Sequence, residues 1–229
     1  MNSKQINARQ MNLEQIEKGL SERRVGAVDG RKYFSVMLLL VQGEKGLRIL
    51  FEQRSRKMRT QPGDVCFPGG RIEPDETPLE CALRETEEEI GIGREQIRVL
   101  GQFDTLYEIS DITMYTFVGT VKEEALQHLK LNPAEVETVF TAPYEFFLET
   151  EPLSYTYDIV QKVEDFPYEA AGIRPDYKWR VGKKTIPVFH YGDGDERQII
   201  WGMTGRIVSW FVSEMERMNC MNDAEHARL

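Results

Sequence analysis

Hydrophobic positions along the chain follow two periodicities, one typical of strands and one typical of helices. A continuous apolar run over residues 33–41 has the length of a strand that is buried on both faces. Residues 47–53 alternate apolar and polar side chains after a glycine-containing turn, and the two segments together predict a hairpin. Residues 12–24 carry apolar side chains at helical spacing, which predicts a short amphipathic helix.

Several agreeing signals predict a second helix from Thr77 to about Ile90. Thr77 can cap this helix, Pro78 suits its first turn, and Glu80 completes a capping box. Gly91 supplies the left-handed residue that commonly ends a helix. The face expected to pack on a sheet consists of the mostly apolar residues Leu79, Ala82, Leu83, Thr86 and Ile90.

The rest of the chain predicts further elements of one α+β domain. They are three strands, a short helix, a hairpin and a final helix, over residues 97–106, 112–121, 135–141, 144–149, 154–190 and 201–218. Within the hairpin, residues 182–184 are the expected turn. Because no repeat or linker divides it, we expect one domain over residues 31–220, with a helical appendage at 1–30 and a flexible tail at 221–229.

Composition narrows the class of function. The chain has 229 residues, 41% of them hydrophobic and 29% charged, as in a globular domain. Its 29 Lys and Arg against 38 Asp and Glu give a net charge of −9, which disfavours a nucleic-acid binder. Cys66, Cys81 and Cys220 lack metal-ligand spacing, so we expect free thiols in a reducing compartment. Without a membrane-spanning run or a secretory signal, we expect a cytoplasmic protein with no membrane contact.

The charge is unevenly distributed along the chain. Residues 71–89 hold eight acids and two bases, whereas residues 48–59 hold five bases and one acid. On the predicted helix, Glu85, Glu88 and Glu89 share one face, where like charges repel unless a cation binds between them. Carboxylate oxygens on a rigid helix suit Mg²⁺. A solvated helix face and a basic edge strand that resists aggregation are the alternative explanations of the two segments.

The spacing of these acids extends over residues 70–92. Glycines, acids and Arg84 are spaced there as G-x5-E-x7-R-E-U-x-E-E-x-G-U, where U is bulky and apolar and only Thr86 departs slightly. This pattern resembles the Nudix box of the Nudix hydrolase superfamily. The resemblance implies an α/β fold, the Nudix α/β/α sandwich with a mixed central sheet. It also implies hydrolysis of a nucleoside diphosphate linked to another moiety.

The resemblance further implies roles for single residues, with Mg²⁺ or Mn²⁺ as the cofactor. The implied metal ligands are Glu85, Glu88, Glu89 and the carbonyl of Gly69. The implied structural positions of the motif are Gly70, Glu76 and Gly91. Arg84 would orient Glu85, and Glu76 would support the loop.

The general base that takes a proton from the attacking water has two candidates. One is Glu85, and the other is Glu135, which follows N-P-A on a later loop. The alternative for Glu135 is an ordinary surface glutamate at the start of a strand. The residues expected to take part in catalysis are therefore Arg84, Glu85, Glu88 and Glu135.

Residues 54–70 narrow the substrate class. They read R-S-x3-R-x3-G-x3-F-P-G-G, which resembles the signature L-L-T-x-R-[SA]-x3-R-x3-G-x3-F-P-G-G of coenzyme A diphosphatases. L-F-E stands at residues 50–52 where L-L-T is usual, and I-W-G-M-T at residues 200–204 resembles a second segment of that family. The resemblance implies hydrolysis of coenzyme A or a derivative to 3′,5′-ADP and a 4′-phosphopantetheine. The expected substrate contacts are Arg54, Arg59 and Phe67, with one arginine on the 3′-phosphate.

Other interpretations stay open. ADP-ribose, NADH or a diadenosine polyphosphate is an alternative substrate, and a regulatory domain that only binds a nucleotide is a more distant alternative. Residues 165–185 are aromatic and basic enough for a lid over pantetheine or adenine, and equally suit a plain surface hairpin. Residues 227–229 loosely resemble a peroxisomal address. We expect a small nucleotide like coenzyme A as the partner, with a homodimer left open.

Overall fold

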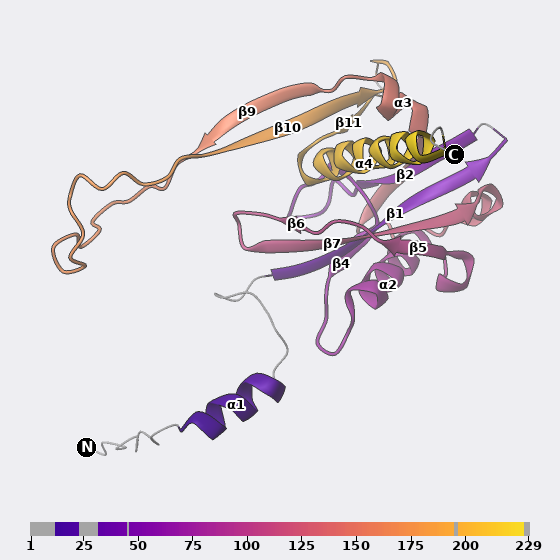
Figure 1. Ribbon diagram of the computed structural model, residues 1–229. Helices are drawn as coiled ribbons and strands as arrows, with labels where there is room; N and C mark the ends of the chain where they lie inside the picture. Colours follow the sequence, from indigo (N-terminus) through magenta and orange to yellow (C-terminus); the bar gives the residue numbers. More distant parts are fainter. Residues whose placement is uncertain (1–11, 23–31, 45, 195–196, 227–229) are drawn as a thin grey trace.

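Figure 1 shows the fold in a computed structural model, which describes residues 12–22, 32–44, 46–194 and 197–226. The central sheet contains β1 (Lys32–Gly43), β2 (Gly46–Arg54), β3 (Val65–Cys66), β4 (Gly69–Arg71), β5 (Arg98–Gln102), β6 (Leu106–Tyr107), β7 (Ile112–Lys122) and β8 (Val136–Pro143). Its main path runs β3-β2-β1-β7-β5, while β4, β6 and β8 pair with β1, β7 and β2. Since β1 and β7 are parallel and β1 and β2 are antiparallel, the sheet is mixed.

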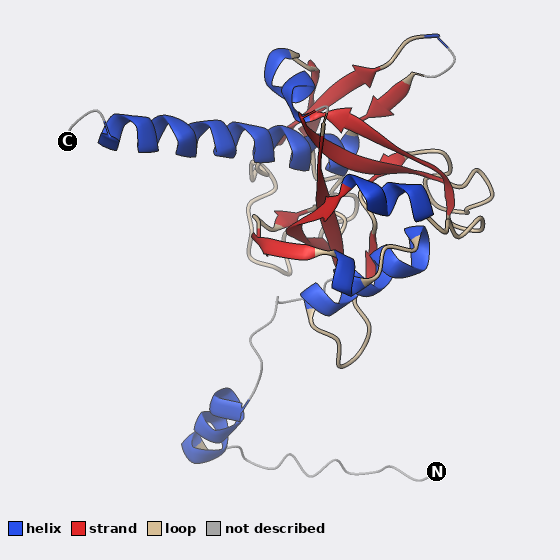
Figure 2. Cartoon of the chain, turned by 90° about the vertical axis from the view of Figure 1, so that its right-hand side faces the viewer, coloured by secondary structure: helices blue, strands red, loops and turns tan. Residues whose placement is uncertain are grey.

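Helices pack on both faces of this sheet, as Figure 2 shows. The helices are α1 (Leu13–Glu22), α2 (Pro78–Ile90), α3 (Tyr144–Glu149) and α4 (Gly202–His226), with 3₁₀ turns η1 (Arg94–Gln96) and η2 (Glu123–His128). One core lies between the sheet and α2, and the other lies between the sheet and α3 and α4. The predicted α/β fold with a mixed central sheet is therefore confirmed.

The apolar run of β1 is buried on both faces, which explains why almost no polar residue interrupts it. Leu38 belongs to the core shared with α4, and its neighbour Leu39 belongs to the core shared with α2. Both side chains are 0% exposed, and the residues on either side alternate in the same way. The alternation follows from the two-residue period of a strand.

Helix α2 begins and ends where its sequence predicts. The backbone N–H of Glu80 donates to the Thr77 hydroxyl, and the backbone N–H of Thr77 donates back to the Glu80 carboxylate at 2.8 Å, which forms the capping box. Gly91 ends the helix in the left-handed region with φ 75°. Thr86 is buried, and its hydroxyl donates a hydrogen bond to the carbonyl of Ala82 at 2.6 Å. That bond satisfies the one polar group on the packed face.

The predicted strand over residues 97–106 is wrong in its extent. The pairing of β5 with β7 is interrupted by a register shift between Val99 and Gly101, and β5 ends at Gln102. Pairing with β7 resumes only over the two residues of β6. A register shift of this kind bends the strand and locally disrupts the ladder, which a count of alternating residues does not reveal.

The predicted turn at residues 182–184 is also wrong. These residues begin β10 (Gly182–Tyr191) and pair with the end of β9 (Leu153–Ile159), so that Gly182 lies opposite Ile159. The hairpin closes through residues 160–181, which Figure 1 shows at its outer end, far from the central sheet. Rings of Phe166, Tyr168, Tyr177 and Trp179 contact one another there and stabilise the connection. β11 (Gln198–Ile200) pairs with the other edge of β10.

The ends of the chain differ in part from expectation. Helix α4 continues to His226, beyond the predicted end at residue 218, so it takes in part of the segment expected to be a tail. Residues 227–229, which carry the resemblance to a peroxisomal address, lie outside the described residues. Helix α1 confirms the predicted helix, and none of its residues is buried. Among the described residues, no helix is long and apolar enough to cross a membrane.

Phe51 tests the core on the α4 side. Its side chain is 0% exposed, and its ring lies 5.2 Å from that of Phe67 and 5.5 Å from that of Phe140. We expect Phe51→Ala to lower the free energy of unfolding by about 3–5 kcal/mol, because truncation leaves a cavity. Urea unfolding followed by circular dichroism measures the change.

The matched control is Tyr155→Ala on β9, whose side chain is 62% exposed. This variant should lose less than about 1 kcal/mol. Equal losses for the two variants would contradict the packing described here.

Candidate functional site

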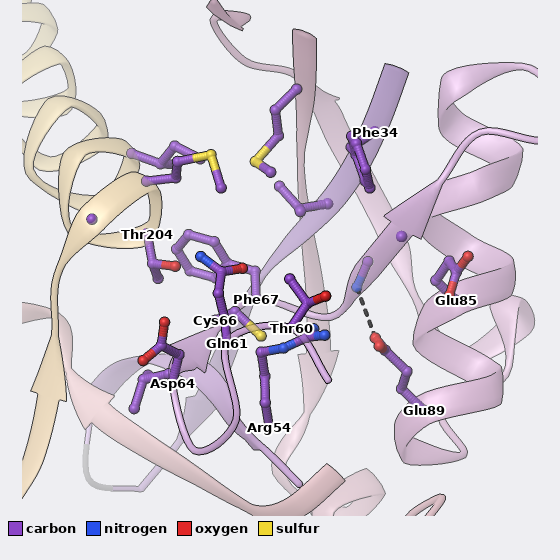
Figure 3. Close-up of a pocket in the computed structure, with 18 of the residues that line it drawn as sticks. Phe34, Arg54, Thr60, Gln61, Asp64, Cys66, Phe67, Glu85, Glu89 and Thr204 are labelled. Carbon is purple, nitrogen blue, oxygen red and sulfur yellow. Dashed lines mark hydrogen bonds between the residues drawn. The ribbon is translucent and has the colours of Figure 1, made fainter. Parts of the chain in front are cut away.

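A cavity of about 510 Å³ opens between α2, the loop after β2 and the start of α4. Figure 3 shows it with α2 on one side and α4 on the other. Residues from the three stretches that the sequence singled out, 54–70, 84–89 and 200–204, contribute to its walls. The fold therefore brings the basic segment and the acidic helix to one place.

The two glycines at the floor of the cavity are required by close approaches. A Cβ on Gly69, whose φ is 156°, would lie 2.3 Å from the carbonyl oxygen of Ser35. A Cβ on Gly70 would lie 2.2 Å from the Glu85 carboxylate. Gly70 therefore leaves the space that the Glu85 side chain occupies, which is a physical reason for glycine at this point of the motif.

Two carboxylates of α2, those of Glu85 and Glu89, line the cavity. Glu89 is 4% exposed, and its Oε2 accepts a hydrogen bond from the backbone N–H of Gly69 at 2.8 Å (Figure 3). Burial raises the pKa of Glu89, and the negative charge of Glu52 raises it further. Burial also raises the pKa of Glu85. Both side chains are thus acids whose charged form lacks full compensation.

Arg84 connects three acids of the motif. Its guanidinium donates to Glu76 at 2.8 Å and 3.1 Å, and its Nη1 donates to both Glu85 and Glu88 at 2.9 Å. The bonds from Arg84 lower the pKa of Glu76. Glu88 is 55% exposed at its side chain and is not among the residues that line the cavity. Glu88 therefore shares the Arg84 guanidinium with Glu85 but lies outside the lining of the cavity.

Glu135 lines the same cavity from the turn before β8. The side-chain amide of Asn132 donates to its carboxylate at 3.0 Å, and its backbone carbonyl accepts from the N–H of Ser55 at 2.7 Å. These bonds fix the turn beside the loop that follows β2. Both candidates for the general base, Glu85 and Glu135, thus lie at one cavity.

The predicted substrate contacts divide into two groups. Arg54 and Phe67 line the cavity, and the Nε of Arg54 is buried with no hydrogen-bond partner among the described residues. Arg59 is exposed and does not belong to the lining. Phe67 is 2% exposed and stacks on Phe51, so most of its surface packs in the core. The structure thus brings Arg54, and not Arg59, to the carboxylates.

One acidic residue near the cavity escaped the sequence analysis. Glu52 on β2 is 1% exposed, and its Oε1 accepts a hydrogen bond from the thiol of Cys66 at 3.3 Å. Burial raises the pKa of Glu52, and burial likewise raises the pKa of Cys66, which keeps the thiol protonated as a donor. The available signal was the departure from L-L-T at residues 50–52, which places an acid inside an apolar strand.

The donor set around the cavity fits a hard divalent cation. Glu85, Glu89 and Glu135 offer carboxylate oxygens, which Mg²⁺ and Mn²⁺ prefer. In the part of the chain that the structure describes, no three His, Cys, Asp or Glu side chains already converge as a metal cluster. Glu85 is held by Arg84 and Glu89 by the Gly69 N–H, so both carboxylates keep one oxygen for a further ligand.

The outer end of the β9–β10 hairpin takes no part in this cavity. None of the described residues in 160–181 lines it. The segment considered as a lid therefore stands apart from the carboxylates in this structure, and Figure 1 shows it at the outer end of the hairpin, away from α2. The described cysteines, Cys66, Cys81 and Cys220, are free thiols, as expected.

Several proteins of known family are similar in sequence to a large part of the chain. It is 35% identical over 145 residues to Nudix hydrolase 3 of Caenorhabditis elegans, covering 62% of the chain and 60% of that protein. It is 32% identical over 144 residues to the peroxisomal coenzyme A diphosphatase NUDT7 of Mus musculus, covering 62% and 59%. It is 30% identical over 177 residues to the mitochondrial coenzyme A diphosphatase NUDT8 of Homo sapiens, covering 76% and 65%.

These matches span only part of the relatives, about 60% of the length of the first two. The model of the NUDIX domain matches residues 32–162, which is more than half of the chain and contains the glycines, α2 and Glu135. On this match, the chain belongs to the Nudix family.

Proposed function

We propose that this protein is a metal-dependent Nudix diphosphatase that hydrolyses coenzyme A or its derivatives. The products would be 3′,5′-ADP and 4′-phosphopantetheine or its acylated form. The observation that carries the proposal is the meeting of two opposite charges in one cavity of about 510 Å³. Arg54, whose Nε has no hydrogen-bond partner among the described residues, suits a phosphate group, whereas Glu85 and Glu89 suit a divalent cation.

Under this proposal, the α2 carboxylates and the floor of the cavity hold the cation. Glu85, Glu89 and the Gly69 carbonyl would bind it, and Glu88 would reach it from the exposed edge. A bound Mg²⁺ or Mn²⁺ neutralises the diphosphate and promotes ionisation of water. Arg84 holds Glu85 through its Nη1 and is itself held by Glu76, so it fixes the direction of the Glu85 carboxylate.

Residues around the cavity can also accept the proton that hydrolysis releases and neutralise negative charge of the substrate. Water forms a bond to one phosphorus, the bridging P–O bond breaks, and the bridging oxygen leaves with the other phosphate. The proton of the water passes to Glu135 or Glu85, which both line the cavity. Arg54 would bind the 3′-phosphate of coenzyme A, which lies apart from the diphosphate that is hydrolysed.

The choice of coenzyme A rests on two supports. Two of the relatives named above are coenzyme A diphosphatases by name. The chain also carries the matching residues from Arg54 to Gly70, and Arg54 lies at the cavity as a phosphate contact should. ADP-ribose, NADH and diadenosine polyphosphates are the competing substrates that an assay must include.

Product analysis tests the proposal directly. The purified chain is incubated with coenzyme A, ADP-ribose, NADH or diadenosine tetraphosphate in Mg²⁺ or Mn²⁺, and products are separated by chromatography. We expect the highest kcat/KM with coenzyme A, release of 3′,5′-ADP, and no hydrolysis in EDTA. Glu85→Gln should lower kcat by about 100-fold or more while the protein stays folded.

Two results would contradict the proposal. A higher kcat/KM with ADP-ribose, NADH or diadenosine tetraphosphate would assign the enzyme to another substrate class of the family. Absence of metal-dependent hydrolysis for every substrate would favour a regulatory domain that only binds nucleotide.

The two arginines of the signature give a second test. The ratio of kcat/KM for coenzyme A to that for dephospho-coenzyme A measures the contribution of the 3′-phosphate. Arg54→Met should lower this ratio about tenfold, since one lost charge-assisted contact of roughly 1.4 kcal/mol has that effect. Arg59→Met, at an exposed position outside the cavity, should leave the ratio unchanged. The opposite result for the two variants would place Arg59 at the phosphate.

A further inference from the structure

Glu52 lies on the face of the sheet that carries α2. Residues of β2 alternate between the two cores, with Phe51 packed in the core of α4 and Leu50 in the core of α2. Because strand side chains repeat every two residues, Glu52 points to the same side as Leu50 and therefore toward α2. Its strand partner on β3 is Cys66, which lines the cavity.

The carboxylate of Glu52 is buried and only half satisfied. Its side chain is 1% exposed, and Oε1 accepts the hydrogen bond from the Cys66 thiol. Oε2 is buried and has no hydrogen-bond partner among the described residues. A buried carboxylate oxygen without a partner carries a large desolvation penalty, and a bound ion would reduce that penalty.

The surroundings of Glu52 supply more negative than positive charge. Glu85 and Glu135 act on it electrostatically, and Glu52 in turn acts on Glu89. Arg54, two residues further along β2, is the cation that acts on it. One arginine beside four acids leaves a negative excess that a divalent cation can offset.

The coenzyme A diphosphatase signature has a neutral threonine at the position of Glu52. Burial of threonine here would carry a smaller desolvation penalty than burial of glutamate, because threonine has no charge. This chain thus adds an acid to the sheet side of a site whose other carboxylates come from α2 and the turn before β8.

We propose that Glu52 is an additional ligand of the divalent-metal site, and that its Oε2 approaches the cation from the sheet, opposite α2. The inference rests on the metal site of the proposed function and extends it to a residue outside the family motif. The ligand is a hard divalent cation of the Mg²⁺ or Mn²⁺ class, as carboxylate donors require.

Binding of Mn²⁺ without substrate tests this inference. The full chain is stripped with EDTA, dialysed and titrated with Mn²⁺, and free Mn²⁺ is followed by electron paramagnetic resonance. Glu52→Gln keeps the shape and removes the charge, whereas Glu52→Thr carries the residue usual in the signature. We expect both variants to bind Mn²⁺ at least tenfold more weakly than the parent chain or to bind one ion fewer.

The matched control is Glu149→Gln, which removes one exposed acid from α3 on the other side of the sheet. Its Mn²⁺ affinity should stay within twofold of the parent. Thermal unfolding gives a second readout. Mn²⁺ should raise the midpoint of the parent more than that of Glu52→Gln, and in EDTA the variant should be at least as stable as the parent.

Unchanged Mn²⁺ affinity and stoichiometry in a folded Glu52→Gln or Glu52→Thr protein would overturn the inference and show that Glu52 is merely a buried acid. If Glu52→Gln does not fold, Glu52→Thr decides the question alone. The outcome is separable from that of the proposed function. Weakened Mn²⁺ binding with no hydrolysis of coenzyme A would uphold the inference and refute the substrate. Hydrolysis of coenzyme A with unchanged Mn²⁺ binding would uphold the substrate and refute the inference.

Discussion

Carboxylates that are buried close together repel one another and lose their hydration, and this penalty is the constraint on which the organisation of the functional site depends. Glu52 and Glu89 are almost fully buried, and Glu85, Glu89 and Glu135 line one cavity. Such an arrangement becomes a cation site if the acids are held in place and a cation, rather than protons, offsets their charge. The negative excess of the whole chain therefore has a local component with a chemical purpose.

The fold meets the first requirement through the placement of α2. Its capping box fixes where the helix starts, and its buried face anchors it on the sheet, so that Glu85 and Glu89 point into the cavity. The Arg84 guanidinium and the N–H of Gly69 then hold one oxygen of each carboxylate. The second requirement, a compensating cation, is what makes metal-dependent hydrolysis the function that this geometry supports best.

Features that depend on local sequence could be predicted, whereas those that depend on tertiary contacts could not. The limits of α2 and the spacing of its acids follow from caps and helical periodicity, which short segments determine. Glu52 was missed because its meaning comes from the sheet face that it shares with Leu50. Arg54 and Arg59 look equivalent in the sequence, and only the course of the loop after β2 brings one of them to the cavity. Residues 182–184 have turn-like composition, yet pairing with β9 makes them a strand.

The central claim is that the buried acids between α2 and β2 form one cation site. The most direct measurement is the anomalous difference map from a crystal of the full chain soaked in Mn²⁺. We expect a peak in the cavity within ligand distance of the Glu85 and Glu89 carboxylates, on the side that faces Glu52. A map with no peak in the cavity, or with peaks only at exposed acids of the surface, would contradict it.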